Sequence, residues 1–518
     1  MGDNFARKER FVGLFLSIVI LLVYSALPTR NHYWDGIGFA LAIEDSPGLT
    51  PLLFNPNHLL YSFFGYLIYQ PIHHLATNIR ALTILSNINT ILSAFAAYLL
   101  FVMLMSKLRN FYYSTWLTLL FAFSATWWKF STDANAYVPS TFLLLLAMYK
   151  LEQTTKPNLV SIGLIHGLSM LLHQIAVFFY PVVLCALFLG PSQRALKPAL
   201  RKALVYTIVA AGTVILAYSW VWFRVLKGTS FQAFTNWVLS HGREEFAFVS
   251  LTHNVLETVR ASIRVFFGGR FSLAFTHVET PLLVILGILL LCTLSVLAFT
   301  LRRAFRNFAT WWKSTEPAGS SLDRMTPLLF VWIGSFWAFL FLWLTPYPYY
   351  RLFYLPGLIL LLGLLLKRHL EPCKGGHSHV LASFVVTMML ANFTFLIYPY
   401  SKAEASPPGN VAIKANKIFQ DDVIYFADFT CDNWIFKYFN KRTSWRPLHR
   451  KDLEAFRDEL LYLKSQGKKT WIDITALDQL TKTQESAAWF EQRVNVTATV
   501  GLIDRKHRIK FSLVTPTP

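Results

Sequence analysis

The sequence predicts an all-α polytopic membrane protein with about eleven transmembrane helices and a small α/β domain at its C-terminal end. Hydrophobic residues make up 54% of the 518 residues and charged residues only 15%. The mean hydropathy is +0.42. A soluble globular domain carries roughly a quarter charged residues. Many apolar runs also approach the roughly 20 residues that cross a bilayer, so an ordinary soluble protein is excluded.

The net charge of +20 has two conceivable origins, a nucleic-acid-binding face or the loops of a membrane protein. The Lys and Arg residues are scattered in short loops between apolar runs, which the positive-inside rule explains better than a nucleic-acid face does. We therefore expect no nucleic-acid partner. The four cysteines show no metal-ligand spacing, which disfavours a zinc site or a disulfide framework.

The topology follows from the first apolar run and from the basic loops. The N-terminus resembles a signal peptide, but no small-residue cleavage site follows the long apolar run 11–28. We interpret that run as a retained first span with the N-terminus in the cytoplasm. The apolar stretch 58–72 is short and contains Pro71 near its end. Counting it as a span would place the later basic clusters outside, so we expect an interfacial or re-entrant helix there.

The chain after residue 398 differs in composition and contains half of the 28 acidic residues. The stretches DDVIYFADF, KTWIDITAL and HRIKFSLVTP have the pattern of strands. RKDLEAFRDELLYLKSQGKK has the pattern of an amphipathic helix that ends at a glycine. We therefore expect a transmembrane domain at 1–398 and an extracytoplasmic α/β domain at 399–518.

Two acidic residues on the expected outer side lie a few residues from the end of an apolar run. They are Asp35 in HYWDGIGFA and Asp133 in KFSTDANAY. A carboxylate near hydrocarbon is costly unless it is hydrogen-bonded or paired. Its pKa can also be raised, which suits a general base. Alternatively, either residue caps a helix by accepting from free N–H groups.

Four stretches follow one another in an order typical of a known superfamily. They are YWDGIGFALAIED with FNPNHLLY, then FAFSATWWKFSTDANAYVPSTFLLLLAMYKLE, GLSMLLHQIAVFFYPVVL and PYPYYRLFYLPGLILLLG. This order resembles the membrane-embedded GT-C glycosyltransferases, which include protein O-mannosyltransferases and lipid A aminoarabinose transferases. The resemblance covers about residues 10–400 and leaves the tail uncovered. It implies a GT-C-like fold and a sugar donor carried on a polyprenyl phosphate.

The resemblance also implies roles for the two acids. Asp35 would be the catalytic base, taking the proton from an acceptor hydroxyl as that hydroxyl attacks the anomeric carbon of the sugar. The donor phosphate would leave, and this single displacement would invert the anomeric centre. Asp133 would be the second catalytic acid, orienting the acceptor or a possible divalent cation. Many members carry a second carboxylate beside the first-loop Asp, but here the neighbour is Gly36 and the next acids are Glu44 and Asp45. Metal dependence therefore stays unknown.

Three further side chains are candidates for binding the donor or the acceptor. Arg351 follows YPYY at the start of a late span, where its forked guanidinium suits a phosphate, although it could instead snorkel to lipid headgroups. His58 in NPNHLLY and His173 in LLHQ could bind phosphate or sugar hydroxyls, or could be satisfied interfacial residues.

The favoured function is a hexosyl- or mannosyl-transferase-like activity in a bacterial plasma (inner) membrane. It would move a sugar from a polyprenyl-phosphate donor to a lipid, glycan or protein acceptor at the extracytoplasmic face. A transporter or flippase is one alternative, but it would place ionisable residues near the bilayer midplane. A polysaccharide polymerase or ligase is another, because the segment 224–279 is rich in Arg and His. That segment also contains an amphipathic stretch expected on the outer leaflet, as a lid or a structural belt.

Overall fold

The computed structural model describes residues 2–153, 157–189, 196–240, 248–314, 324–370, 377–402, 406–427, 431–440, 444–448, 453–504 and 507–517. These residues form two compact units. The first unit comprises Met1–Thr29 and Ala42–Ser401, and the second comprises Arg30–Leu41 and Lys402–Pro518. This division differs from the expected one by the short segment Arg30–Leu41. Residues 241–247 of the Arg- and His-rich segment lie outside the described residues.

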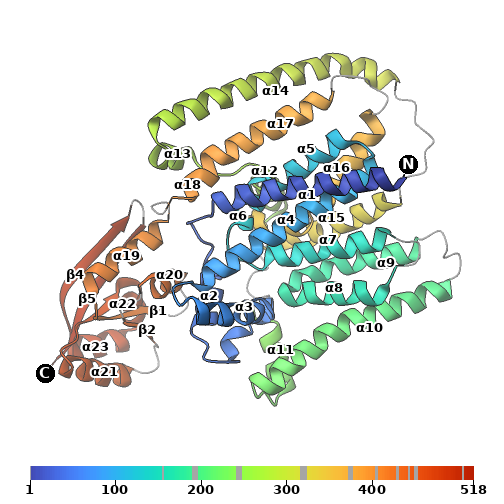
Figure 1. The fold of residues 1–518 in the computed structure, drawn as a ribbon. Helices are drawn as coiled ribbons and strands as arrows, with labels where there is room; N and C mark the ends of the chain where they lie inside the picture. The colour runs from blue at the N-terminus through green and yellow to red at the C-terminus, as the bar shows by residue number, and fades with distance from the viewer. Residues whose placement is uncertain are drawn as a thin grey trace. The chain divides into compact units, whose positions relative to one another are not determined.

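The first unit is a bundle of long apolar helices (Figure 1). Within the described ranges, six helical stretches are long and apolar enough to cross a membrane: Glu9–Ala26, Ala81–Leu108, Leu196–Val225, Thr280–Arg303, Met325–Leu342 and His379–Tyr400. Three shorter apolar helices accompany them: Leu159–Leu172, Gln174–Phe188 and Leu355–Lys367. The protein is therefore a multi-pass integral membrane protein. The number of eleven spans stays a prediction.

The helices of this unit are α1 (Gly2–Ala26), α2 (Trp34–Glu44, which begins in the second unit), α3 (Tyr61–Leu75), α4 (Ala81–Leu108), α5 (Phe111–Ala122), α6 (Ala125–Ser131), α7 (Tyr137–Gln153), α8 (Leu159–Leu172), α9 (Tyr180–Phe188), α10 (Leu196–Trp220), α11 (Phe231–Val238), α12 (Leu251–Phe266), α13 (Phe271–His277), α14 (Thr280–Ser314), α15 (Met325–Leu342), α16 (Leu355–Leu370), α17 (His377–Asn392) and α18 (Tyr398–Tyr400). Short 3₁₀ turns are η1 (Pro51–Leu53), η2 (Pro56–His58), η3 (Gln174–Phe179) and η5 (Pro348–Phe353). Two π-helical turns, η4 (Val221–Val225) and η6 (Phe393–Ile397), extend α10 and α17.

Two glycines let α8 and α10 pack closely, side by side in Figure 1. A Cβ atom at Gly163 would lie 2.9 Å from Val209 Cγ1, and one at Gly167 would lie 2.8 Å from Thr213 Cβ. Small residues four apart allow such an approach between membrane helices. The chain after α8 is thereby held against α10, and this chain carries His173.

A helix is present at the expected place, 58–72, as α3, preceded by η2. It is not among the helices that meet the criteria for a span in the described part of the chain. Its interfacial position stays a prediction. The expected amphipathic helix is α12. Its buried face consists of Asn254, Thr258, Ala261 and Val265, and its exposed apolar face includes Val255, Leu256, Val259 and Ile263. An exposed apolar face beside a protein-facing one suits a helix lying at the membrane surface.

The second unit contains a mixed sheet of five strands in the order β2-β1-β3-β5-β4. The strands are β1 (Val423–Ala427), β2 (Ser444–Leu448), β3 (Thr470–Asp473), β4 (Val494–Asp504) and β5 (His507–Pro516). β1 is parallel to β2 and β3, whereas β5 is antiparallel to β3 and β4. The helices are α19 (Pro407–Phe419), α20 (Cys431–Phe439), α21 (Leu453–Ser465), α22 (Ile474–Leu480) and α23 (Gln484–Arg493).

The expected elements of this unit are largely confirmed. The amphipathic helix is α21, and Gly467 with φ +71° follows its end, a conformation that favours glycine. The expected strand KTWIDITAL is half wrong, because it ends at Asp473 and continues as α22. The reason is periodicity: Ala476 and Leu480 lie one helical turn apart and both enter the core of the unit.

Candidate active site

Asp35 lies in the first turn of α2 and is half-buried. A carboxylate in the first turn of a helix is stabilised by the free N–H groups and by the helix dipole. The local geometry is therefore compatible with a structural role as well as with catalysis. The segment Arg30–Leu41 that carries Asp35 belongs to the second unit. The other four candidate residues belong to the first unit and are described within it.

Asp133 is fully buried in the turn between α6 and α7. Its Oδ1 accepts from the backbone N–H of Ala134 at 2.9 Å, and its Oδ2 lies 3.5 Å from Lys129 Nζ. The side chain of Asn89 in α4 donates to the carbonyls of Asp133 at 2.7 Å and Asn135 at 2.8 Å. A carboxylate can be buried here because it is paired and hydrogen-bonded, and the turn that carries it is fixed to α4.

His58 and His173 lie edge to face, with ring centres 4.5 Å apart and an interplanar angle of 87°. Both side chains are buried. His58 Nδ1 lies 3.1 Å from the carbonyl oxygen of Leu172, so this nitrogen donates. His173 Nδ1 accepts from the backbone N–H of Ile175 at 3.3 Å, which leaves the proton of the neutral ring on Nε2.

The Nε2 of His173 has no hydrogen-bond partner among the described residues. His173 lies in the turn between α8 and η3 and is only 1% exposed. Burial lowers the pKa of this imidazole well below its usual range, and the neighbouring His58 acts in the same direction. The ring is therefore neutral at physiological pH and presents one buried, unused N–H donor.

Tyrosine rings connect this histidine pair to the other candidate loops. The ring centre of Tyr137 at the start of α7 lies 5.0 Å from that of His173 and 5.2 Å from that of Tyr349 in η5. Tyr350 lies 5.9 Å from His173. Tyr349 also lies 5.6 Å from Phe130, in the helix that leads to Asp133. We call His58, Tyr137, His173, Tyr349 and Tyr350 the histidine cluster. The loops that carry the four candidates of the first unit meet at this cluster.

Arg351 in η5 is 1% exposed, so it does not extend to the surface as a snorkelling side chain would. Its Nη1 donates to the carbonyl of Tyr347 at 2.9 Å and its Nη2 to that of Thr345 at 3.0 Å. Its Nε has no hydrogen-bond partner within the described ranges. Burial lowers the pKa of this guanidinium. Arg351 thus holds the turn beside the histidine cluster and keeps one donor unused.

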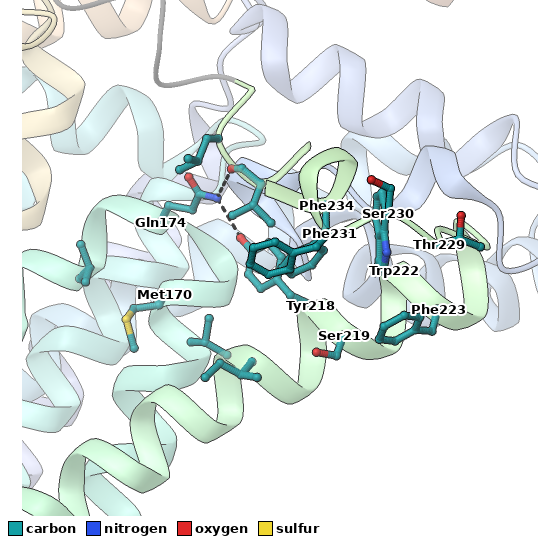
Figure 2. A pocket seen from close by; sticks show the side chains of 15 residues that line it. Met170, Gln174, Tyr218, Ser219, Trp222, Phe223, Thr229, Ser230, Phe231 and Phe234 are labelled. Atoms are coloured by element: carbon teal, nitrogen blue, oxygen red, sulfur yellow. Dashed lines mark hydrogen bonds between the residues drawn. The ribbon is translucent and has the colours of Figure 1, made fainter. Parts of the chain in front are cut away.

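An apolar cavity of about 690 Å³ lies in the first unit between α8, α10, η4 and α11. Figure 2 shows aromatic side chains along one part of it, including Trp222, Phe223, Phe231 and Phe234. A cavity of several hundred Å³ is large enough for a drug-sized ligand. The chemistry of this lining suits a hydrocarbon chain rather than a polar solute.

The chain links the histidine cluster to the cavity, because Gln174 lines the cavity and directly follows His173. The Nε2 of Gln174 lies 3.0 Å from each of three oxygens: the carbonyls of Pro56 and Val238 and the hydroxyl of Tyr218. Figure 2 shows the amide of Gln174 pointing toward Tyr218, and both residues line the cavity. The single turn at His173 and Gln174 therefore joins a buried polar site to an apolar cavity.

The sequence left open whether a divalent cation takes part. No group of three or more His, Cys, Asp or Glu side chains is arranged to hold a metal ion in the part of the chain that the structure describes. Sequence reasoning also missed Tyr137 and Gln174. The signal for Gln174 was present, because an amide inside an otherwise apolar run needs a polar partner.

No family model matches the chain, and no curated protein matches it. Solved structures do. ArnT from Cupriavidus metallidurans bound to undecaprenyl phosphate has a TM-score of 0.55 and 11% identity, over 99% of this chain and 98% of that chain. The same protein in the apo state has a TM-score of 0.58 and 11% identity, over 97% of both chains. The chain therefore has the fold of ArnT over nearly its entire length.

Proposed function

We propose that this protein is a glycosyltransferase that moves a sugar from a polyprenyl-phosphate donor to an acceptor hydroxyl with inversion. The observation that carries the proposal is the turn at His173 and Gln174. In this turn His173 has a buried N–H donor that no described residue uses, and the next residue, Gln174, lines an apolar cavity of about 690 Å³.

The polarity of this site matches the polarity of the donor. A polyprenyl-linked sugar has a long hydrocarbon chain, a phosphate at its end and a hydroxylated ring beyond the phosphate. The apolar cavity suits the chain, and the His173 Nε2–H suits a phosphate or hydroxyl oxygen. The tyrosines of the histidine cluster offer faces and hydroxyls to the sugar. The fold of ArnT supports the same kind of carrier, since that protein was solved with undecaprenyl phosphate.

We assign the candidate residues the following roles in the reaction. Asp35 takes the proton of the acceptor hydroxyl while that oxygen bonds to the anomeric carbon. The bond from the anomeric carbon to the donor phosphate breaks, and the phosphate leaves with the electron pair. Asp133 orients the acceptor. His58, His173 and Arg351 bind donor or acceptor oxygens, Arg351 through the donor at Nε that the turn leaves unused.

We further propose the setting of this reaction. The transmembrane domain at 1–398 carries the site in a bacterial plasma membrane, with the N-terminus in the cytoplasm and residues 399–518 outside. The donor sugar is a hexose such as mannose, and the acceptor is a lipid, a glycan or a protein that meets the enzyme at the outer face.

Replacing the proposed base tests this function. We expect Asp35→Asn to lower kcat for sugar transfer by a factor on the order of 10²–10⁴, the usual contribution of a general base. The matched control is Asp45→Asn, which neutralises an exposed acid of the same loop and should leave kcat unchanged. Unfolding temperatures of both variants establish that they fold. Full activity of Asp35→Asn would refute the proposed mechanism.

A further inference from the structure

The segment that carries Asp35 belongs to the C-terminal unit rather than to the membrane bundle. The chain leaves the first unit after Thr29, contributes Arg30–Leu41 to the second unit, and returns at Ala42. Asp35 therefore shares a compact unit with a sheet and helices that follow it by almost 400 residues in the sequence. The second unit thus has a direct means of influencing the proposed base.

One contact between this segment and the rest of its unit is that of Gly38 with Trp434. A Cβ atom built on Gly38 would lie 3.2 Å from both Cε3 and Cζ3 of the Trp434 indole and 3.6 Å from Cδ2. The six-membered ring of the indole thus lies against the bare backbone of α2 at Gly38. Trp434 lies in α20, almost 400 residues after Gly38 in the sequence. A side chain at position 38 would push this ring away.

Asp35 and Gly38 lie on the same face of α2, because residues three apart in a helix are neighbours. The indole of Trp434 therefore supports the face that bears the carboxylate. α2 has only 11 residues. An isolated helix of that length is marginal in water, so its order depends on packing against other elements. Trp434 supplies such packing at the first turns, where Asp35 is located.

We propose that Trp434 is a positioning residue: it holds the first turns of α2 so that Asp35 points at the reacting hydroxyl. Trp434 then acts on the proposed base from within the same compact unit. The effect on rate rests on the proposed function, whereas the effect on the order of α2 does not.

The test uses the full-length protein in detergent or nanodiscs, with Trp434→Ala as the disrupting variant. We expect amide hydrogen exchange across residues 30–41 to accelerate by at least about tenfold, because local opening no longer breaks the indole contact. We expect kcat to fall by a factor on the order of 10², the cost of a misplacement of about 1 Å, with the KM for the donor nearly unchanged. Trp434→Phe should restore most of kcat, since a ring remains on Gly38.

The matched control is Trp489→Ala in α23. Trp489 packs on the core of the same unit and its Nε1 donates to Glu454 at 2.7 Å, so its loss weakens the unit without removing the ring on Gly38. It should lower the unfolding temperature but leave exchange at 30–41 and kcat unchanged. If Trp434→Ala does not fold, Gly38→Ala gives the same readouts with a smaller displacement of the indole.

The outcomes separate the two proposals. Unchanged exchange at 30–41 in Trp434→Ala would overturn the positioning role, and so would an equal effect of Trp489→Ala. Accelerated exchange together with full activity of Asp35→Asn would leave the packing role intact and refute the catalytic assignment instead. A proportional rise in KM without a loss of kcat would also overturn the proposal, because it would indicate weaker substrate binding rather than a misplaced base.

Discussion

His166 lies in the middle of α8 and His173 directly follows its end. Both are buried, but they have opposite hydrogen-bonding states. The Nε2 of His166 lies 2.9 Å from the carbonyl of Ala176, so it donates, and its Nδ1 accepts from the hydroxyl of Tyr206 at 2.5 Å. Both of its ring nitrogens are therefore satisfied. His173 leaves Nε2 without a partner in the described part of the chain.

The difference separates a structural histidine from the one that we propose binds a ligand. A buried donor without a partner costs roughly 1–3 kcal/mol, so most buried polar groups are paired. His166 joins α8, α10 and η3 in one hydrogen-bond network, so we expect it to stabilise the fold. His173 keeps an N–H that no described residue uses, one residue before Gln174 in the lining of the apolar cavity. The two residues should therefore respond to mutation in different measurements.

The largest expected effect is on stability, at His166. His166→Ala should lower the free energy of unfolding by roughly 3–5 kcal/mol, because it opens a cavity and leaves the Tyr206 hydroxyl and the Ala176 carbonyl buried without partners. Thermal or denaturant unfolding in detergent measures this loss. Tyr206→Phe serves as the graded comparison: it removes only one hydroxyl and should cost about 1–3 kcal/mol.

A small loss of unfolding free energy in His166→Ala would contradict the structural role of His166. If its unfolding free energy changed by less than about 1 kcal/mol while donor affinity fell, His166 would have to be reassigned to the binding site.

The next effect is on affinity, at His173. His173→Asn removes the Nε2–H but keeps a side-chain acceptor for the N–H of Ile175, and Asn is a favoured residue at that capping position. The affinity for undecaprenyl phosphate should fall about 10- to 100-fold, the value of one hydrogen bond to a charged group. Binding can be measured by the thermal shift of the purified protein over a series of lipid concentrations.

The stability of His173→Asn provides its control. The unfolding free energy without lipid should stay within about 1 kcal/mol of the wild type, because Asn keeps a side-chain acceptor that caps the N–H of Ile175. A loss as large as that of His166→Ala, with unchanged lipid affinity, would show that both histidines are structural.

The sequence predicted the helical membrane unit, the small α/β unit and a short helix at 58–72. It could do so because apolar length, basic loops and hydrophobic periodicity are local features of the chain. It also drew attention to Asp35 and Asp133 near helix ends, because few acidic residues occur in the apolar part of the sequence. The helix α22 was missed because an apolar run of a few residues suits both a strand and a helix.

The sequence did not reveal which residues meet. Tyr137, His173 and Tyr350 come from three distant parts of the chain, and only the fold brings their rings together. The contact of Trp434 with Gly38 spans most of the sequence, and neither residue has a motif of its own. The unused donor on His173 likewise depends on the backbone that satisfies its other nitrogen, which no pattern of residue types encodes.

The central claim is that the turn at His173 and Gln174 binds the phosphate end of a polyprenyl donor whose chain fills the adjoining apolar cavity. An experimental structure of the full-length protein with undecaprenyl phosphate tests it most directly. We predict a phosphate oxygen within hydrogen-bond distance of His173 Nε2 and the chain between α8, α10 and α11. Lipid bound elsewhere, with the cavity closed or filled by side chains, would contradict the account.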